Sequence, residues 1–104
     1  RSLREGRIVP SVEPRTIADG LLTSLGDVTF AIISRDVEDI ATASEEGIEA
    51  AMRLVWERMK IVIEPSAAVP LAALLEGTLD LGGLRVGVVL SGGNVDLARL
   101  PWSA

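Results

Sequence analysis

The segment LSGGN, residues 90–94, places a hydroxyl, two glycines and an amide directly after the apolar run RVGVVL. In an open parallel sheet, ligands bind beyond the carboxyl ends of the strands, so a polar turn at this point could contact a ligand. Gly92 and Gly93 would let the backbone approach a ligand closely, and the Ser91 hydroxyl can donate or accept a hydrogen bond. A tight turn that binds nothing explains the same five residues equally well.

The residue types that are missing limit the chemistry further. The 104 residues include no cysteine and no histidine, which excludes disulfides, thiolate metal ligands and a Ser-His-Asp triad. Acid–base chemistry is left to carboxylates, hydroxyls and one lysine, Lys60. Two tryptophans, one phenylalanine and a net charge of −5 disfavour nucleic acid as a partner. Neither a membrane-spanning run nor an export signal is present, so we expect a cytoplasmic protein without membrane contact.

The clearest predicted element is a helix over residues 44–60. Ser44 can cap its N-terminus, and Glu45 and Glu46 follow in the first turn, where the helix dipole favours negative charge. Lys60 lies at the other end, where the dipole favours a cation. Apolar residues recur at helical spacing and predict the buried face: Ile48, Ala51, Met52, Val55 and Met59.

Shorter elements are predicted on both sides of this helix. Residues 17–22 indicate a turn, and residues 27–35 favour a short helix capped by Asp27, with a strand as the competing interpretation. Residues 37–43, VEDIATA, suit a short strand.

Two further elements complete the pattern. Residues 66–76 predict a helix that is apolar all round and therefore buried, with Pro70 in or just before its first turn and Gly77 ending it. Residues 85–90, RVGVVL, predict a strand covered on both faces, as in a parallel sheet. The fold class is α/β, but two strands are too few for a covered sheet. Either these strands pair with a sheet supplied by another segment, or the fold is a small two-layer α/β unit.

Three segments together resemble one enzyme family. TIADGL, LVWERMKIVIEPSAAVPLAAL and VVLSGGNVDL, in this order and at this separation, are similar to the C-terminal half of the large domain of serine racemases and threonine/serine dehydratases. These are fold-type II pyridoxal-phosphate (PLP) enzymes, whose sheet is like that of the tryptophan synthase β subunit. The resemblance covers nearly all of residues 8–97. It implies that residues 1–104 form one partial domain, the C-terminal portion of a parallel-sheet, PLP-binding large domain.

The resemblance also implies roles for single residues at the cofactor. Ser91 would donate a hydrogen bond to the pyridine nitrogen of PLP, beside Gly92, while Glu64 would lie near the edge of the ring and Gly20 beside it. Asn94 resembles a position that contacts nucleotide in animal serine racemases. Other roles stay open: Glu64 could cap the following helix, Gly20 could serve as a turn glycine, and Asn94 could stabilise a turn.

The remaining parts of such a site would lie outside this segment. The family's Schiff-base lysine and phosphate-binding loop lie upstream, so no catalytic residue is expected in this chain, and Lys60 is interpreted as a solvated helix-end residue. The resemblance allows for a divalent cation bound outside the segment, and no metal ligand is assigned here, Asp27 and Asp36 included. The acidic side chains of Asp19, Asp36, Glu38 and Asp39 are interpreted as solvated.

The function predicted from the resemblance is that of a PLP-dependent dehydratase (ammonia-lyase) or racemase acting on hydroxy amino acids such as serine, threonine or 3-hydroxyaspartate. This chain would supply the pyridine-nitrogen side of the cofactor site. Its partners would be the N-terminal remainder of the enzyme, the amino acid substrate and a second copy in a homodimer. The alternative is a small non-catalytic α/β binding or regulatory domain, in which SGGN binds an anion.

Overall fold

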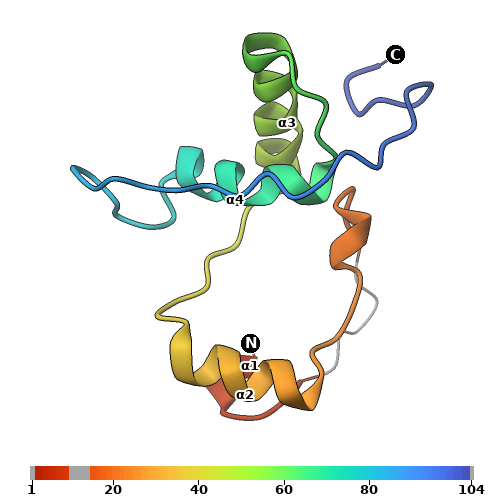
Figure 1. Ribbon diagram of the computed structural model, residues 1–104. Coiled ribbons are helices and arrows are strands. Elements are labelled where there is room, and N and C mark those ends of the chain that lie inside the picture. Colours follow the sequence, from red (N-terminus) through yellow and green to blue (C-terminus); the bar gives the residue numbers. More distant parts are fainter. Residues whose placement is uncertain (1, 10–14, 104) are drawn as a thin grey trace. The chain divides into compact units, whose positions relative to one another are not determined.

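The computed structural model describes residues 2–9 and 15–103, which form two compact units. One unit contains helices α1 (Ser2–Glu5) and α2 (Asp27–Asp36). The other contains the short 3-10 helix η1 (Asp19–Leu21), helices α3 (Glu45–Met59) and α4 (Pro65–Glu76), and the C-terminal segment (Figure 1). The candidate site lies entirely in this second unit.

Helix α2 forms where the sequence predicted a helix and not the competing strand. Its N-cap is Gly26, so Asp27 lies in the first turn and is not the cap that we expected. None of its residues is buried, and Val28 is 75% exposed. Phe30 and Ile33 are half-buried, so the apolar side of α2 is only partly covered within the described residues.

Helix α3 has the ends that the sequence predicted. The Ser44 side chain accepts a hydrogen bond from the Gly47 N–H at 2.9 Å and so caps the first turn. Lys60 ends the helix in the left-handed region at φ 58°, which confirms its place at the helix end. On the polar side, Arg53 and Glu57 form an ion pair at 2.7 Å, one helical turn apart.

The buried face of α3 is shorter than predicted. Ile48, Ala51, Met52 and Val55 are buried as expected, and they form the core together with residues of α4. Met59 is 55% exposed, so its assignment to the core was wrong. The fully buried positions end one turn earlier, at Val55, and Trp56 continues the covered side as a half-buried residue whose indole N–H donates to the Ile63 carbonyl at 2.9 Å.

Helix α4 lies against α3 (Figure 1). The side chains at this contact are mostly small. It begins with Pro65 in the first turn, where the missing N–H leaves no bond unmade, and it ends at Gly77, with φ 70°. Pro70 lies inside the helix and not in its first turn, so the prediction for Pro70 was wrong; here it removes the backbone bond to Ser66.

The burial of α4 is one-sided. Its fully covered alanines, Ala67, Ala68 and Ala72, face the core, whereas Leu75 is 57% exposed. The prediction of a helix buried all round was therefore wrong for this chain. Alanines at the contact let the two helix backbones approach closely, so the core is well packed although it has few large side chains.

One carboxylate joins the start of α3 to the end of α4. Glu76, in the last turn of α4, accepts hydrogen bonds from the Ser44 hydroxyl at 2.6 Å and from the Ser44 N–H at 3.1 Å. A Cβ on Gly47 would run into the same carboxylate, so a larger residue here would have to move the Glu76 side chain away from Ser44. The start of α3 is thus held by its own cap and by the end of α4.

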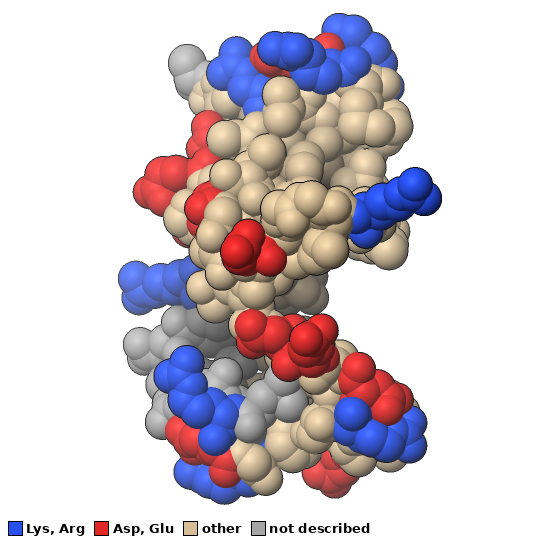
Figure 2. All heavy atoms as spheres, turned by 90° about the vertical axis from the view of Figure 1, so that its left-hand side faces the viewer, with Lys and Arg blue, Asp and Glu red and all other residues tan. Residues whose placement is uncertain are grey.

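Within residues 2–9 and 15–103 no strand is formed, so the two strands predicted over residues 37–43 and 85–90 are absent and the parallel sheet is not confirmed. A strand needs a neighbouring strand that forms a ladder of backbone hydrogen bonds with it. Here the segments that flank α4 are joined by one such bond, from the Glu64 N–H to the Gly92 carbonyl at 3.0 Å. Val86 and Val89 are 44% and 76% exposed instead of covered. Figure 2 shows a broad area without charged side chains on this unit.

Candidate functional site

Three segments that are far apart in the sequence meet at the start of α4. The backbone N–H of Gly20 donates a hydrogen bond to the Ser66 hydroxyl at 3.0 Å, which joins η1 to the first turn of the helix. Two residues earlier, the Glu64 N–H donates to the Gly92 carbonyl at 3.0 Å. The structure therefore brings together the ADG bend, the IEPS segment and the SGG turn that the sequence singled out.

The turn packs closely against the segment before α4. A Cβ on Gly92 would run into the Glu64 carboxylate, and a Cβ on Gly93 would lie 2.9 Å from the backbone oxygen of Val62. Neither glycine has a positive φ, so backbone conformation does not require glycine at either position. The Glu64 carboxylate ends a flexible side chain that can move aside for Gly92, whereas the backbone atoms beside Gly93 cannot. The turn can lie this close to the segment before α4 because Gly93 has no side chain.

We expect Gly93→Ala to destabilise the protein by about 1–3 kcal/mol, because the new methyl group must push against backbone atoms that cannot rotate away. Gly87→Ala is the matched control, since a Cβ there meets no atom within 4 Å. Urea denaturation of both variants measures the difference. Equal free energies of unfolding for the two variants would show that the turn does not pack as described.

The Ser91 hydroxyl is available to a ligand. The residue is exposed, and within the described residues its side chain makes no hydrogen bond. Glu64 is half-buried and occupies the N-cap position of α4, yet its side chain makes no capping hydrogen bond. The carboxylate therefore does not cap the helix, which removes the structural role that the sequence left open for Glu64.

Gly20 is exposed and lies in η1 with its N–H bonded to Ser66. Its φ is not positive, so the alternative of a turn glycine required by backbone conformation is not supported. Its lack of a side chain matters for another reason, because a Cβ would lie 2.9 Å from the Ser66 oxygen.

Asn94 follows the two glycines of the turn and lies beside a cavity. It lines a cavity of about 270 Å³ together with Asp19, Pro65 and Arg99. Asn94 is exposed, and within the described part of the chain its side chain makes no hydrogen bond. Its contact with nucleotide stays a prediction.

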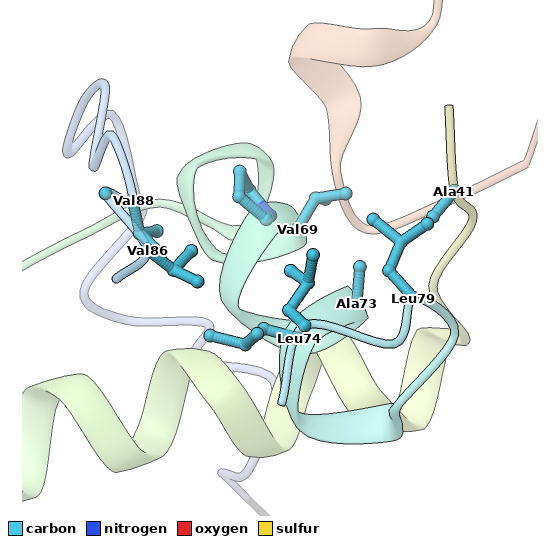
Figure 3. Close-up of a pocket in the computed structure, with 10 residues that line it drawn as sticks. Ala41, Val69, Ala73, Leu74, Leu79, Val86 and Val88 are labelled. Carbon is cyan, nitrogen blue, oxygen red and sulfur yellow. The ribbon is translucent and has the colours of Figure 1, made fainter. Parts of the chain in front are cut away.

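A second cavity, of about 330 Å³, lies between α4 and the segments that follow it (Figure 3). The side chains of Val69, Ala73 and Leu74 line it from α4, and Leu79 and Val86 line it from the following segments. No polar side chain of the described residues lines this cavity, so it offers none to bind a phosphate or a pyridine nitrogen. The candidate site is the junction at Gly20, Glu64 and Ser91 and not this larger cavity.

The segment that carries Gly20 is also held from α3. The Glu45 carboxylate accepts a hydrogen bond from the Ile17 N–H at 2.9 Å. The Thr16 hydroxyl, and after it the Ile17 N–H, hold the pKa of Glu45 below its ordinary value. Because bonds to the charged form are responsible, this contact is strongest when Glu45 is ionised.

The contact predicts a pH dependence of stability. A carboxylate with a lowered pKa in the folded state stabilises the fold above its unfolded pKa of about 4.3, and this contribution is lost as the pH falls through the folded pKa. We expect Glu45→Gln to have a lower melting temperature than the wild type at pH 7, with the difference disappearing near pH 3. Glu46→Gln, in the same helical turn, controls for the helix dipole alone. A difference between Glu45→Gln and wild type that persists unchanged at low pH would contradict this account.

Sequence reasoning missed the residues that hold the site together. Ser66 and Glu45 were not identified as partners of the ADG bend, and Glu76 was not identified as a partner of Ser44. Ser66 follows a proline at a predicted helix start, a position typical of side chains that bond to backbone groups, but nothing in the sequence indicates which backbone group it binds.

Among residues 2–9 and 15–103, no group of three or more acidic side chains is placed to hold a metal ion. In the same residues, no helix has the length and apolar character needed to cross a bilayer.

Comparison with known proteins identifies a family for this chain. The family model described as "Pyridoxal-phosphate dependent enzyme" matches residues 1–92. The chain is 48% identical over 103 residues to the β-hydroxyaspartate dehydratase of Paracoccus denitrificans, covering 99% of this chain and 33% of that protein. It is 47% identical over 100 residues to the L-threo-3-hydroxyaspartate ammonia-lyase of Saccharomyces cerevisiae, covering 95% of this chain and 31% of that protein.

Solved structures give the same result. The serine racemase of Dictyostelium discoideum superposes with a TM-score of 0.82 and 49% identity, over 93% of this chain and 31% of that one. The threonine deaminase of T.th. superposes with a TM-score of 0.80 and 46% identity, over 95% of this chain and 36% of that one. These neighbours are fold-type II enzymes, which supports the predicted fold type although no strand is formed in the described residues.

The chain spans about a third of the length of these relatives. The family model nevertheless covers most of the chain, including Gly20, Glu64, Ser91 and Gly92. The resemblance noted from the three sequence segments is therefore confirmed, as is PLP as the cofactor of the family. The chain belongs to the pyridoxal-phosphate dependent enzyme family.

Proposed function

We propose that this chain is part of a PLP-dependent dehydratase (ammonia-lyase) or racemase acting on hydroxy amino acids such as serine, threonine or 3-hydroxyaspartate. The observation that carries the proposal is the near-half identity, along almost the whole chain, to enzymes named for hydroxyaspartate. Residues 1–104 would form the C-terminal portion of the PLP-binding large domain. The family assignment favours this function over a non-catalytic α/β domain.

The residues at the junction fit the pyridine side of the cofactor. The Ser91 hydroxyl is exposed and bonded to no described residue, and the glycines beside it add no side chain that would block a flat ring. When bound, PLP withdraws electrons from the α-carbon of an amino acid. A neutral hydroxyl at the pyridine nitrogen leaves that nitrogen largely unprotonated, which moderates this withdrawal and favours loss of the β-hydroxyl or reprotonation over transamination.

Other residues of the junction would bind or orient the ring. Gly20 and Gly92 would present backbone near it, and Glu64 would place a carboxylate at its edge. The lysine and the phosphate-binding loop would come from the remainder of the enzyme, which fits relatives about three times as long. A homodimer and a cytoplasmic location stay predictions from the resemblance.

The test is product analysis of the full-length enzyme with PLP. With 3-hydroxyaspartate, serine and threonine as substrates, we expect either ketoacid and ammonia or the inverted amino acid from at least one of them. Alanine is the control for elimination, because it has no β-hydroxyl to lose. An enzyme that binds PLP but forms neither product from any of the three substrates would contradict the proposal.

A further inference from the structure

One side chain, that of Ser66, connects the Gly20 bend to α4. Its oxygen accepts the Gly20 N–H at 3.0 Å, although 46 positions separate the two residues in the sequence. Ser66 is the second residue of α4, in a well-formed first turn that begins with Pro65. A rigid helix start therefore fixes a backbone group of an otherwise exposed bend.

The fit between the two residues is close on both sides. A Cβ on Gly20 would lie 2.9 Å from the Ser66 oxygen and 3.4 Å from the Ser66 Cβ. Gly20 does not have a positive φ, so the approach of Ser66, and not backbone conformation, favours glycine there. A side chain at position 20 would have to displace the Ser66 hydroxyl, which is the group that bonds the bend to α4.

The segment at the start of α4 that carries Ser66 also contacts the SGG turn. Glu64, two residues before Ser66, donates its N–H to Gly92, which directly follows Ser91. The other end of the bend is bonded to α3 through Ile17 and Glu45. Ser66 therefore completes a chain of short contacts that sets Gly20 and Ser91 at fixed positions relative to one another.

We propose that Ser66 is a positioning residue for the cofactor: its hydroxyl holds the Gly20 backbone at the distance from the Ser91 turn that the PLP ring requires. The inference rests on the proposed function, in which Gly20 and Ser91 both border the ring. Ser66 acts through Gly20 and does not itself take part in the reaction.

The experiment uses the full-length enzyme and two readouts that do not depend on turnover, the Kd for PLP and the visible circular dichroism of the PLP-saturated protein. Ser66→Ala is expected to raise the Kd about 2- to 10-fold, as for one lost hydrogen bond, and to change the cofactor ellipticity. Ser66→Thr, which keeps the hydroxyl, is expected to restore both. Thr78→Ala is the matched control, because it removes a hydroxyl bond of 3.1 Å to the Ala73 carbonyl at the opposite end of α4. It is expected to leave both readouts at the wild-type value.

Gly20→Ala gives a second arm that does not depend on the folding of Ser66→Ala. Its methyl group must displace the Ser66 hydroxyl, so the Kd is expected to rise and the ellipticity to change. In the double variant the Gly20→Ala effect is expected to be smaller, since the obstructing oxygen is gone. Wild-type Kd and ellipticity in Ser66→Ala, or an unchanged effect of Gly20→Ala in the double variant, would overturn the inference. An enzyme whose PLP binding responds to Ser91 substitutions but not to these ones would leave the proposed function standing.

Discussion

Replacing Ser91 by alanine in the full-length enzyme is expected to leave the fold intact, weaken PLP retention and lower the rate of β-elimination. The residue is exposed and its side chain bonds to no described residue, so its removal costs the protein little. The lost hydrogen bond to the pyridine nitrogen is worth about 0.5–1.5 kcal/mol in binding, before any effect on the rate. PLP content after dialysis and ketoacid formation measure the two effects. Ser34→Ala, an exposed serine in α2 outside the unit that holds the site, is the control.

Ser91→Asp is expected to act differently from Ser91→Ala. A carboxylate at this position favours a protonated pyridine nitrogen, which strengthens electron withdrawal and shifts the products toward transamination. Half-transamination with serine and threonine is the measurement. Wild-type PLP content together with an unchanged product spectrum in both variants would show that Ser91 does not contact the pyridine nitrogen, and the turn would then be structural only.

The largest expected loss of stability comes from Met52→Ala. Met52 is fully buried where α3 packs against α4, in a core whose other members there are mostly alanines. Small neighbours with short side chains cannot fill the space that a missing thioether leaves, so a cavity remains. We expect a cost of about 2–5 kcal/mol in the free energy of unfolding, measured by chemical denaturation.

Met59→Ala is the matched control, because it makes the same chemical change one turn beyond the end of the core. Met59 is 55% exposed, so its replacement is expected to cost less than about 0.5 kcal/mol. Similar costs for the two methionines would show that the face of α3 is assigned incorrectly.

Sequence patterns predicted α2, α3 and α4, but not α1, because the signals that define these three helices are local. The Ser44 cap, the helical spacing up to Val55 and the stop at Gly77 depend on residues within a few positions of one another. Met59 shows where such reasoning fails, since the pattern continues after the packing has ended. Pro70 shows a second failure, because a helix held by neighbours tolerates one missing backbone bond.

The predicted strands depend on partners that local patterns do not supply. Residues 85–90 have the apolar composition of a covered strand, yet Val89 is 76% exposed and no ladder forms in the described residues. For the site, the sequence identified Gly20, Glu64 and Ser91, which the structure gathers at one junction. It did not identify Ser66, because a contact across 46 positions leaves no periodic signal in the chain.

The most direct test of the central claim is ¹⁵N NMR of the full-length enzyme reconstituted with PLP labelled at the pyridine nitrogen. If the Ser91 hydroxyl donates to that nitrogen, the wild type gives the chemical shift of a hydrogen-bonded, unprotonated pyridine. Ser91→Ala then moves the signal toward that of a pyridine without this bond, and Ser91→Asp moves it toward that of a protonated pyridinium. A wild-type signal typical of pyridinium, or one that neither substitution moves, would contradict the assignment of Ser91 to the cofactor.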